Sequence, residues 1–412
     1  MASAGKGRLR VLFLSQRFPL PMDTGGKIRT GKMLEHVQDD LDVTLISNVE
    51  SPKDDAYLPE VKRLCADFHP VPWKETAKFS PAFYLRVLGR LGSSYPITVL
   101  NDYSRDLEGA VLSAVRRETY DLLICDFLQP SLNFEHVFGY PTLLFQHNVE
   151  SVIPERHAAV ARNPVFRLFW RSQARKMARY EQLACRRFSG VVTVSDADKR
   201  TLEDRFGARN VFAIPTGVDT EYFAPSETPE DDDTLVFTGS MDWLPNEDAI
   251  LFFAREILGR IKRAVPKVKF RVVGRSPSRH LQKELSGIPE IEIVGWVSDV
   301  RPEIARATVY VIPLRIGGGT RIKAYEAMAM GKPVVSTSIG LEGLPVTDGR
   351  DVAIADGPDA FADAVIRLLK NRPEKERLGA AARAFVESNC SWHRAARTFS
   401  DICHEVAQPR SY

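Results

Sequence analysis

The stretch that decides the fold reads Gly317-Gly318-Gly319-Thr320-Arg321-Ile322-Lys323-Ala324-Tyr325-Glu326 and continues to Pro333 as Ala-Met-Ala-Met-Gly-Lys-Pro. Upstream, Val309-Tyr310-Val311-Ile312 is an apolar run typical of a buried strand. Three glycines let the backbone turn sharply and approach a ligand closely. Thr320 predicts the start of a helix, and Gly331 before Pro333 predicts its end. A strand, a glycine-rich loop and a helix N-terminus form an anion site, because the free N–H groups of the first helical turn point outward.

Two cations, Arg321 and Lys323, stand in the first turn of this predicted helix, where the helix dipole alone would favour acids. Their position indicates an anionic ligand, for which we expect phosphate. Glu326 follows Lys323 by three residues on the same helix face and is placed to accept hydrogen bonds from sugar hydroxyls. The alternative is a capped structural helix with a Lys323–Glu326 surface pair. We favour the ligand site, because a structural helix needs neither three glycines nor cations at its start.

The composition sets limits on the rest of the chain. A length of 412 residues predicts about two domains, and 44% hydrophobic with 26% charged residues is typical of a globular protein. The net charge of +3 is too small to indicate nucleic acid binding. The five scattered cysteines indicate free thiols in a reducing compartment. Because no segment resembles a signal peptide or reaches membrane-spanning length, we expect a cytoplasmic protein.

The first half of the chain alternates apolar runs and helical patterns, as in a parallel α/β sheet. Residues 51–119 read as mostly helical and loop-rich. Between the first predicted strand and its helix stand Gly25 and Gly26, at the edge where open α/β folds bind ligands; a simple tight turn is the alternative. The expected strands cover residues 10–15, 42–48, 121–126, 141–146 and 190–195.

One of these strands ends in Gln146-His147-Asn148-Val149-Glu150. Most lone histidines are structural, but His147 follows the carboxyl end of a strand and has polar neighbours. We therefore expect His147 to take part in the chemistry.

Residues 163–188 contain seven Lys/Arg and one acid, Glu181, with Phe166, Leu168, Phe169 and Trp170 near the start. A basic amphipathic helix lying on a membrane is one interpretation. The other is a solvated helix whose aromatic side chains enter the core, and we favour this second interpretation.

A Pro-containing acidic segment, residues 224–233, predicts a linker. Beyond it a second series of strands is expected at 234–238, 268–273, 291–294, 308–312, 333–336 and 351–354, with a helix at 247–264. Gly239, Gly274 and Gly295 close three of these strands, consistent with a nucleotide-sized ligand along that edge. The predicted domains are residues 1–222 and 223–394, and a final helix at about 395–412 is expected to pack back on the first domain.

Gly217-Val218-Asp219, the glycine-rich loop and the segment from Glu326 to Val335 resemble the retaining glycosyltransferases of family 4 (group 1). The segment 147–150 and the whole of 234–355 share the likeness. Within the family, the sequence is similar to sugar transferases of bacterial exopolysaccharide clusters. The resemblance implies the GT-B architecture, in which two doubly wound Rossmann-like domains face each other across a cleft. It also implies a UDP- or GDP-type nucleotide-sugar donor, a glycan or lipid-linked acceptor, and a location in the cytoplasm that leaves open a peripheral contact of the basic N-terminal domain with the inner face of the membrane.

The resemblance also assigns residues. Glu326 matches the second glutamate of the family signature, which binds ribose, whereas the first glutamate falls on Gly318. The segment 239–246 lacks the arginine and lysine that the family commonly places there, and Arg321 and Lys323 are expected to replace them. The residues implied on the donor side are Gly239, Ser240, Asn246, Gly274, Trp296, Val297, Gly318, Gly319, Thr320, Glu326 and Glu342, and those on the acceptor side are Gly25, Gly26, Asn148 and Glu150.

The expected chemistry is transfer of a sugar with retention, in which His147, Arg321 and Lys323 are catalytic. Fixed cations and a helix N-terminus stabilise the departing diphosphate, so we expect neither a metal nor another cofactor. The rivals are a sugar-nucleotide epimerase or phosphorylase on the same fold, and a non-catalytic glycan-binding or scaffold protein. Turnover of a nucleotide sugar separates the enzyme from the scaffold.

Overall fold

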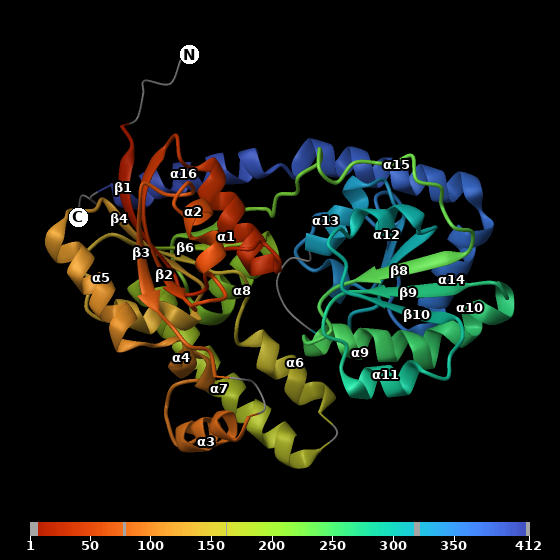
Figure 1. The fold of residues 1–412 in the computed structure, drawn as a ribbon, viewed down its shortest axis with the longest axis horizontal. Coiled ribbons are helices and arrows are strands. Elements are labelled where there is room, and N and C mark those ends of the chain that lie inside the picture. The colour runs from red at the N-terminus through yellow and green to blue at the C-terminus, as the bar shows by residue number, and fades with distance from the viewer. Residues whose placement is uncertain (1–6, 77–79, 162, 317–321, 409–412) are drawn as a thin grey trace. The chain divides into compact units, whose positions relative to one another are not determined.

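The computed structural model describes residues 7–76, 80–161, 163–316 and 322–408. The chain forms two compact units, one made of Met1–Pro215 with Trp392–Tyr412 and the other of Thr216–Ser391 (Figure 1). The sequence placed these boundaries at 222/223 and 394/395. The difference has a local cause: the Val218 N–H donates to the Cys390 carbonyl, and the Tyr222 carbonyl accepts from Arg301, so the connecting segment is held by the second unit.

The first unit is built on a parallel sheet, which has seven strands among the described residues, in the order β3-β2-β1-β4-β5-β6-β7. The strands are β1 Leu9–Ser15, β2 Leu41–Val49, β3 Asp67–Pro72, β4 Leu122–Asp126, β5 Thr142–Phe145, β6 Gly190–Thr193 and β7 Val211–Ala213. The helices are α1 Gly25–His36, α2 Leu58–Val61, α3 Pro81–Arg90, α4 Ile97–Asp102, α5 Arg105–Arg117, α6 Val152–Val160, α7 Pro164–Arg187, α8 Asp196–Phe206 and α16 Trp392–Ala407.

Apolar side chains of alternating direction place a hydrophobic core on each face of this sheet. Val11 and Phe13 of β1 belong to one core, while Leu12 and Leu14 belong to the other. The first core includes seven side chains of α16: Trp392, Ala395, Ala396, Phe399, Ile402, Cys403 and Val406. The last helix of the chain therefore completes the core of the N-terminal unit.

The second unit has a parallel sheet with six strands in the described residues, in the order β10-β9-β8-β11-β12-β13. The strands are β8 Thr234–Thr238, β9 Lys269–Val273, β10 Ile291–Gly295, β11 Val309–Ile312, β12 Val334–Ser336 and β13 Ala353–Ile354. The helices are α9 Leu244–Phe252, α10 Leu258–Ala264, α11 Arg279–Leu285, α12 Arg301–Arg306, α13 Ile322–Ala329, α14 Pro358–Lys370 and α15 Arg372–Asn389. A π-helical turn, Phe253–Ile257, joins α9 to α10.

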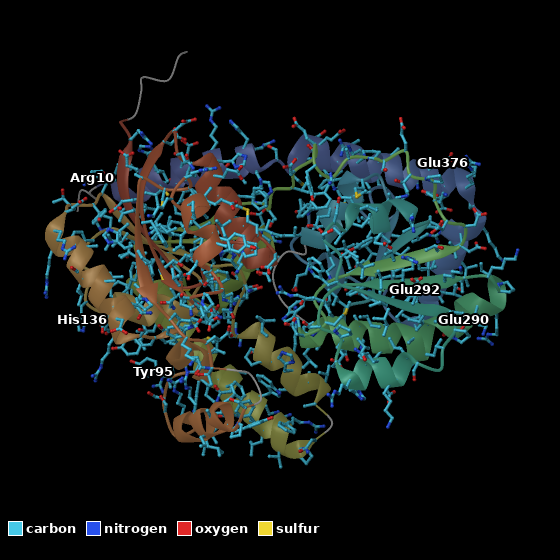
Figure 2. All side chains as sticks on the ribbon, viewed as in Figure 1. Arg10, Tyr95, His136, Glu290, Glu292 and Glu376 are labelled. Atoms are coloured by element: carbon cyan, nitrogen blue, oxygen red, sulfur yellow. The ribbon has the colours of Figure 1, made fainter. Side chains whose placement is uncertain are left out.

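Charged side chains cover the exposed edge strand of this second sheet. Figure 2 shows Glu290 and Glu292 at the start of β10. Arg271 of β9 pairs with Glu292 and also donates to Glu303 at 2.6 Å, between Nη2 and Oε2. Charges on an edge strand oppose pairing with another chain.

Both sheets are extended in two opposite directions from a central pair of strands, β1 and β4 in the first unit and β8 and β11 in the second. In such sheets ligands bind outside the carboxyl ends of the strands, where the order of connection reverses. The predicted fold class, two doubly wound α/β domains, is confirmed at the level of each unit. Ligand sites are therefore expected in the loops that follow these four strands.

Several elements differ from those expected from the sequence. Residues 51–119 were read as helices and loops, but 67–72 form β3, an edge strand whose polar residues hide its alternation. The long helix expected at 247–264 is interrupted by the π-helical turn. The favoured interpretation of α7, in which its aromatic side chains enter the core, is wrong for Phe166, which is 61% exposed, whereas Phe169 and Trp170 are partly buried. The neighbouring Val165 and Leu168 are 73% and 69% exposed.

No helix within the described ranges combines the length and the apolar composition needed to cross a membrane.

Candidate functional site

The donor-side site predicted for the second unit lies at the carboxyl ends of β8 and β9. The Gly239 N–H donates to the Val273 carbonyl at 2.9 Å, which holds the two loops together. At Gly274, φ is +153°, and a Cβ atom would lie 1.9 Å from the Gly239 carbonyl oxygen. Only glycine can therefore stand at 274, because any other side chain would collide with backbone.

Lys323, in the first turn of α13, reaches across to this loop. Its Nζ donates to Asn246 Oδ1 at 3.0 Å and lies 4.0 Å from the centroid of the Phe237 ring. The buried Asn246 in turn donates to the Ser240 carbonyl at 2.7 Å. A Cβ at Gly239 would lie 2.6 Å from Lys323 Nζ, so the ammonium group sits directly above the β8 loop. The structure brings Gly239, Ser240, Asn246, Gly274 and Lys323 together at the switch point of the sheet.

A second cation at this loop was missed in the sequence. Arg275 donates from Nε to Ser240 Oγ at 3.1 Å, and Ser240 Oγ donates to Asp242 Oδ1 at 2.6 Å. The signal was available, because Arg275 directly follows Gly274 at the end of a predicted strand. Arg275, from the loop after β9, and Lys323, from α13, thus bring an arginine and a lysine to the segment 239–246, which itself contains neither.

Glu326 follows Lys323 by one turn of α13 and is partly buried. Burial raises the pKa of its carboxyl to about 7, and the neighbouring Lys323 lowers it in part. Glu326 forms no side-chain hydrogen bond with the described residues. The alternative of a simple Lys323–Glu326 surface pair is not favoured by this geometry, since the lysine is directed to Asn246.

The remaining donor-side residues lie along the same edge. Trp296 follows β10 and is 71% exposed, while Val297 packs partly against the core. Glu342 follows β12 and a short 3-10 turn, Ile339–Leu341. Gly318, Gly319, Thr320 and Arg321 lie outside the described residues. Gly331 ends α13 with φ of +69°, as the sequence predicted.

The acceptor-side site predicted for the first unit is centred on a buried histidine–aspartate pair. Asp126, the last residue of β4, is fully buried, and its Oδ1 lies 2.7 Å from Nε2 of His147. Asp126 Oδ2 accepts from Ser15 Oγ at 3.0 Å and from Thr30 Oγ1 at 2.7 Å. The strands β4 and β5 are neighbours, which is why residues that follow them meet. The sequence predicts Asp126 at the end of a strand but gives no sign of its pairing with His147.

Aromatic rings enclose the imidazole of His147. The Phe127 ring stacks on it with a centroid distance of 3.9 Å and an angle of 12°. Burial lowers the pKa of His147, and Asp126 opposes this in part. A neutral imidazole that donates Nε2–H to Asp126 keeps Nδ1 as a hydrogen-bond acceptor.

The predicted glycines and acids of this unit surround the pair. A Cβ at Gly26 in the first turn of α1 would lie 2.7 Å from the Phe127 ring, so a larger residue here would displace the ring that stacks on His147, and Gly25 precedes it. Glu150 accepts from Asn148 Nδ2 at 3.1 Å, and burial raises the pKa of its carboxyl to about 7. Arg17, which follows β1 and was not predicted, holds its guanidinium 5.1 Å from the Phe127 centroid. Together these groups make a polar site that can orient a hydroxyl group.

The described residues contain no group of three or more His, Cys, Asp or Glu side chains that could hold a metal ion.

Comparison with protein families matches residues 35–222 to the family described as "Glycosyltransferase Family 4" and residues 232–371 to "Glycosyl transferases group 1". A phosphatidyl-myo-inositol mannosyltransferase of Mycobacterium leprae is 29% identical over 227 residues, which are 53% of this chain and 59% of that protein. An uncharacterized 44.6 kDa protein in the cps region of Klebsiella pneumoniae is 24% identical over 179 residues, 42% of this chain and 45% of that protein. The chain thus spans about half to three fifths of the length of these relatives.

Solved structures share the fold over almost the whole chain. Anabaena Alr3699/HepE, solved with UDP and glucose, has a TM-score of 0.69 at 12% identity and covers 97% of this chain and 100% of its own. Sucrose-phosphate synthase from Thermosynechococcus elongatus has a TM-score of 0.72 at 16% identity, with coverage of 97% and 99%. These neighbours establish the GT-B fold.

Proposed function

The chain belongs to the group 1 and family 4 glycosyltransferases, and from this premise we propose that it transfers a sugar from a nucleotide-sugar donor to a glycan or lipid-linked acceptor. The observation that carries the proposal is the Lys323–Asn246–Gly239 arrangement at the switch point of the second sheet, with Glu326 one helical turn away. A cation held over a glycine loop suits a diphosphate, and a carboxylate beside it that forms no side-chain hydrogen bond within the described ranges suits ribose hydroxyls.

On the donor side, Lys323 and Arg275 stabilise the charge that develops on the diphosphate as the glycosidic C–O bond breaks. Asn246 fixes the Lys323 ammonium group, so that little reorganisation is needed in the transition state. Arg321 is proposed to add a further cation. Because side chains balance the charge of the diphosphate, we propose that transfer needs no metal ion. The proposed donor is of the UDP or GDP type, with its base held by Trp296 and Val297 and with Glu342 facing the donor.

On the acceptor side, His147 presents Nδ1 to the acceptor hydroxyl and either takes its proton or orients it. Asp126 keeps the imidazole in the tautomer that leaves Nδ1 free to accept. Asn148 and Glu150 orient further hydroxyl groups. We propose retention of the anomeric configuration, as in the family that the sequence resembles.

The acceptor is proposed to be a growing glycan or a lipid-linked sugar of bacterial exopolysaccharide or envelope synthesis, used at the cytoplasmic side of the membrane. The relative from the Klebsiella cps region and the mycobacterial mannosyltransferase that acts on a phosphatidyl-inositol support this choice.

The test is a panel of UDP- and GDP-sugars incubated with the protein and lipid-linked or oligosaccharide acceptors in the presence of a chelator. Release of nucleoside diphosphate with a matching glycosylated product is expected for one donor. Lys323→Ala should slow that transfer by roughly 10²–10³-fold, the usual cost of removing one such stabilising group. Lys332→Ala is the control and should leave the affinity for the donor unchanged, because Lys332 pairs with Glu230. Nucleotide binding without turnover would instead indicate a scaffold, and loss of activity on chelation would exclude the metal-free reaction.

A further inference from the structure

Helix α3 exposes its apolar face, which globular proteins normally bury. None of its residues, Pro81–Arg90, is buried. Leu85 and Leu88 are 69% and 62% exposed, and Tyr84 and Leu91 are also exposed. Positions 84, 88 and 91 are spaced by four and three residues, so these side chains form one continuous stripe. An apolar stripe of this kind indicates a surface that is covered when the protein functions.

The first turns of α7 add a second apolar surface in the same unit, formed by the exposed Val165, Phe166 and Leu168. Two contacts tie the end of α3 to α7. Lys176 Nζ donates to the Leu91 carbonyl at 2.8 Å, and the ring of Tyr95, labelled in Figure 2, packs edge-on against Tyr180 at 5.8 Å. Figure 1 shows α3 and the first half of α7 at the same end of the unit. We call the exposed apolar residues of these two segments the apolar tip: Tyr84, Leu85, Leu88, Leu91, Val165, Phe166 and Leu168.

The two segments that carry the apolar tip bear only positive charge. Residues 81–91 and 163–180 contain no acid, and their seven cations are Arg86, Arg90, Arg167, Arg171, Arg175, Lys176 and Arg179. Arg171 and Arg175 line a cavity of about 420 Å³ with Ala158, Ala174 and the Glu155–Arg205 pair. Within the described residues neither Arg171 nor Arg175 has an ion-pair partner.

We propose that the apolar tip is a membrane-docking surface that inserts its leucines and Phe166 into the interface of an anionic lipid bilayer, with the surrounding cations on the headgroups. Apolar side chains flanked by Lys and Arg are the composition that binds such interfaces. A second copy of the chain is disfavoured, because a two-fold contact would place the two positive surfaces against each other. The inference does not depend on the proposed sugar transfer, since docking requires neither donor nor acceptor.

The experiment is flotation of the full chain with vesicles of phosphatidylcholine, alone or mixed with phosphatidylglycerol, without nucleotide sugar. The wild type should float with the mixed vesicles at low salt and hardly with phosphatidylcholine alone. Arg171→Ala with Arg175→Ala should lower the partition coefficient by roughly twenty-five-fold, because each cation near an anionic surface contributes about fivefold. Leu85→Ser with Leu88→Ser should lower it by at least roughly tenfold.

Matched controls address folding and position. Leu183→Ser changes a leucine on the same helix α7 that is 42% exposed but lies beyond the apolar tip, and it should float like the wild type. Arg372→Ala removes an exposed cation of the second unit and should also float normally. Far-UV circular dichroism and melting temperatures should be unchanged in all variants, because the altered side chains are exposed.

Several results would overturn the proposal. They are failure of the wild type to float with mixed vesicles, equal loss in the controls, and displacement from vesicles by inorganic phosphate at the same ionic strength, which would indicate a simple anion site. Formation of a dimer that Leu85→Ser with Leu88→Ser dissociates, without vesicle binding, would assign the apolar tip to a second copy.

Discussion

At the scale of single residues, Asp126 decides what His147 can do. A carboxylate accepts the Nε2–H of His147 at 2.7 Å and leaves Nδ1 as an acceptor. An amide at position 126 can donate to Nε2 instead, which moves the imidazole proton to Nδ1 and removes that acceptor. We expect Asp126→Asn to slow transfer by roughly 10²–10⁴-fold, the range for loss of a positioned acid or base.

Three measurements on Asp126→Asn check this prediction: transfer rate, affinity for the nucleoside diphosphate, and melting temperature. Affinity should stay unchanged, because the donor-side residues belong to the other unit. An equal loss in Ser15→Ala, which removes a different hydrogen bond to the same carboxylate, would show that Asp126 acts through packing alone.

Glu326 provides a residue-scale prediction of pH dependence. Its carboxyl has a pKa raised to about 7 by burial, against 4.5 for an ordinary glutamate, so it is protonated below neutrality and ionised above it. An ionised carboxylate is the stronger acceptor for ribose hydroxyls. Affinity for nucleoside diphosphate should therefore rise between about pH 6 and pH 8 more steeply in the wild type than in Glu326→Gln.

Isothermal titration of both proteins over this range separates the effect from titration of the phosphate, which is common to both. Affinity curves that run parallel in the two proteins would show that Glu326 does not bind the ribose.

The raised pKa of Glu326 also affects stability. Between pH 4.5 and about 7 the folded state holds a proton that the unfolded state has lost, so this group lowers the free energy of unfolding as the pH rises through that window.

At the scale of elements, the β8 and β9 loops are held together by contact between two glycines. A Cβ at 274 would meet the Gly239 carbonyl oxygen at 1.9 Å, and φ of +153° disfavours any side chain there. Gly274→Ala should destabilise the second unit by about 1–3 kcal/mol, the usual cost of forced overpacking, and should weaken nucleotide binding.

Gly287 is the matched control, because a Cβ there meets nothing within 4 Å. Gly287→Ala should leave stability unchanged or raise it by up to about 1 kcal/mol through the unfolded chain. Urea unfolding of both variants checks the pair. Equal stabilities would mean that the two loops separate without cost.

The sequence predicted those elements whose residues carry a clear signal. The strands β1, β2, β4 and β8 are buried and rich in apolar residues, and each is predicted within one residue of its observed bounds. The edge strand β3 was missed because His69, Pro70 and Pro72 break its apolar pattern. The exposed start of α7 was misread, since periodicity tells which residues share a helix face but not whether that face meets the core or solvent.

At the scale of the whole molecule, alternation of strands and helices predicted two doubly wound domains, but it could not predict the pairs that form the sites. Asn246 and Lys323 are 77 residues apart, and Asp126 and His147 come from separate strands. Only the order of strands in each sheet brings them together. The apolar tip likewise joins α3 to a helix whose contact residue is 85 positions away.

The path of the chain leads to the last prediction, because α16 belongs to the unit that the chain left at Pro215. Phe399 of α16 is 1% exposed and packs 5.1 Å from Phe145, whose ring lies 4.6 Å from His147. Phe361 of α14 is as deeply buried in the other unit, 6.0 Å from Phe253. Truncating either phenylalanine to alanine should cost about 3–5 kcal/mol, but in different units.

Hydrogen exchange with peptide resolution distinguishes the two. Phe399→Ala should speed exchange in β1, β4 and β5 and slow sugar transfer, since it removes the packing behind the histidine, while the exchange of β8 and β9 stays as in the wild type. Phe361→Ala should speed exchange in β8 and β9, leave β1, β4 and β5 as in the wild type, and lower the affinity for nucleotide. Faster hydrogen exchange in all these strands in both variants would mean that the two units unfold together. In that case α16 would stabilise the whole chain and not only the N-terminal unit that it completes.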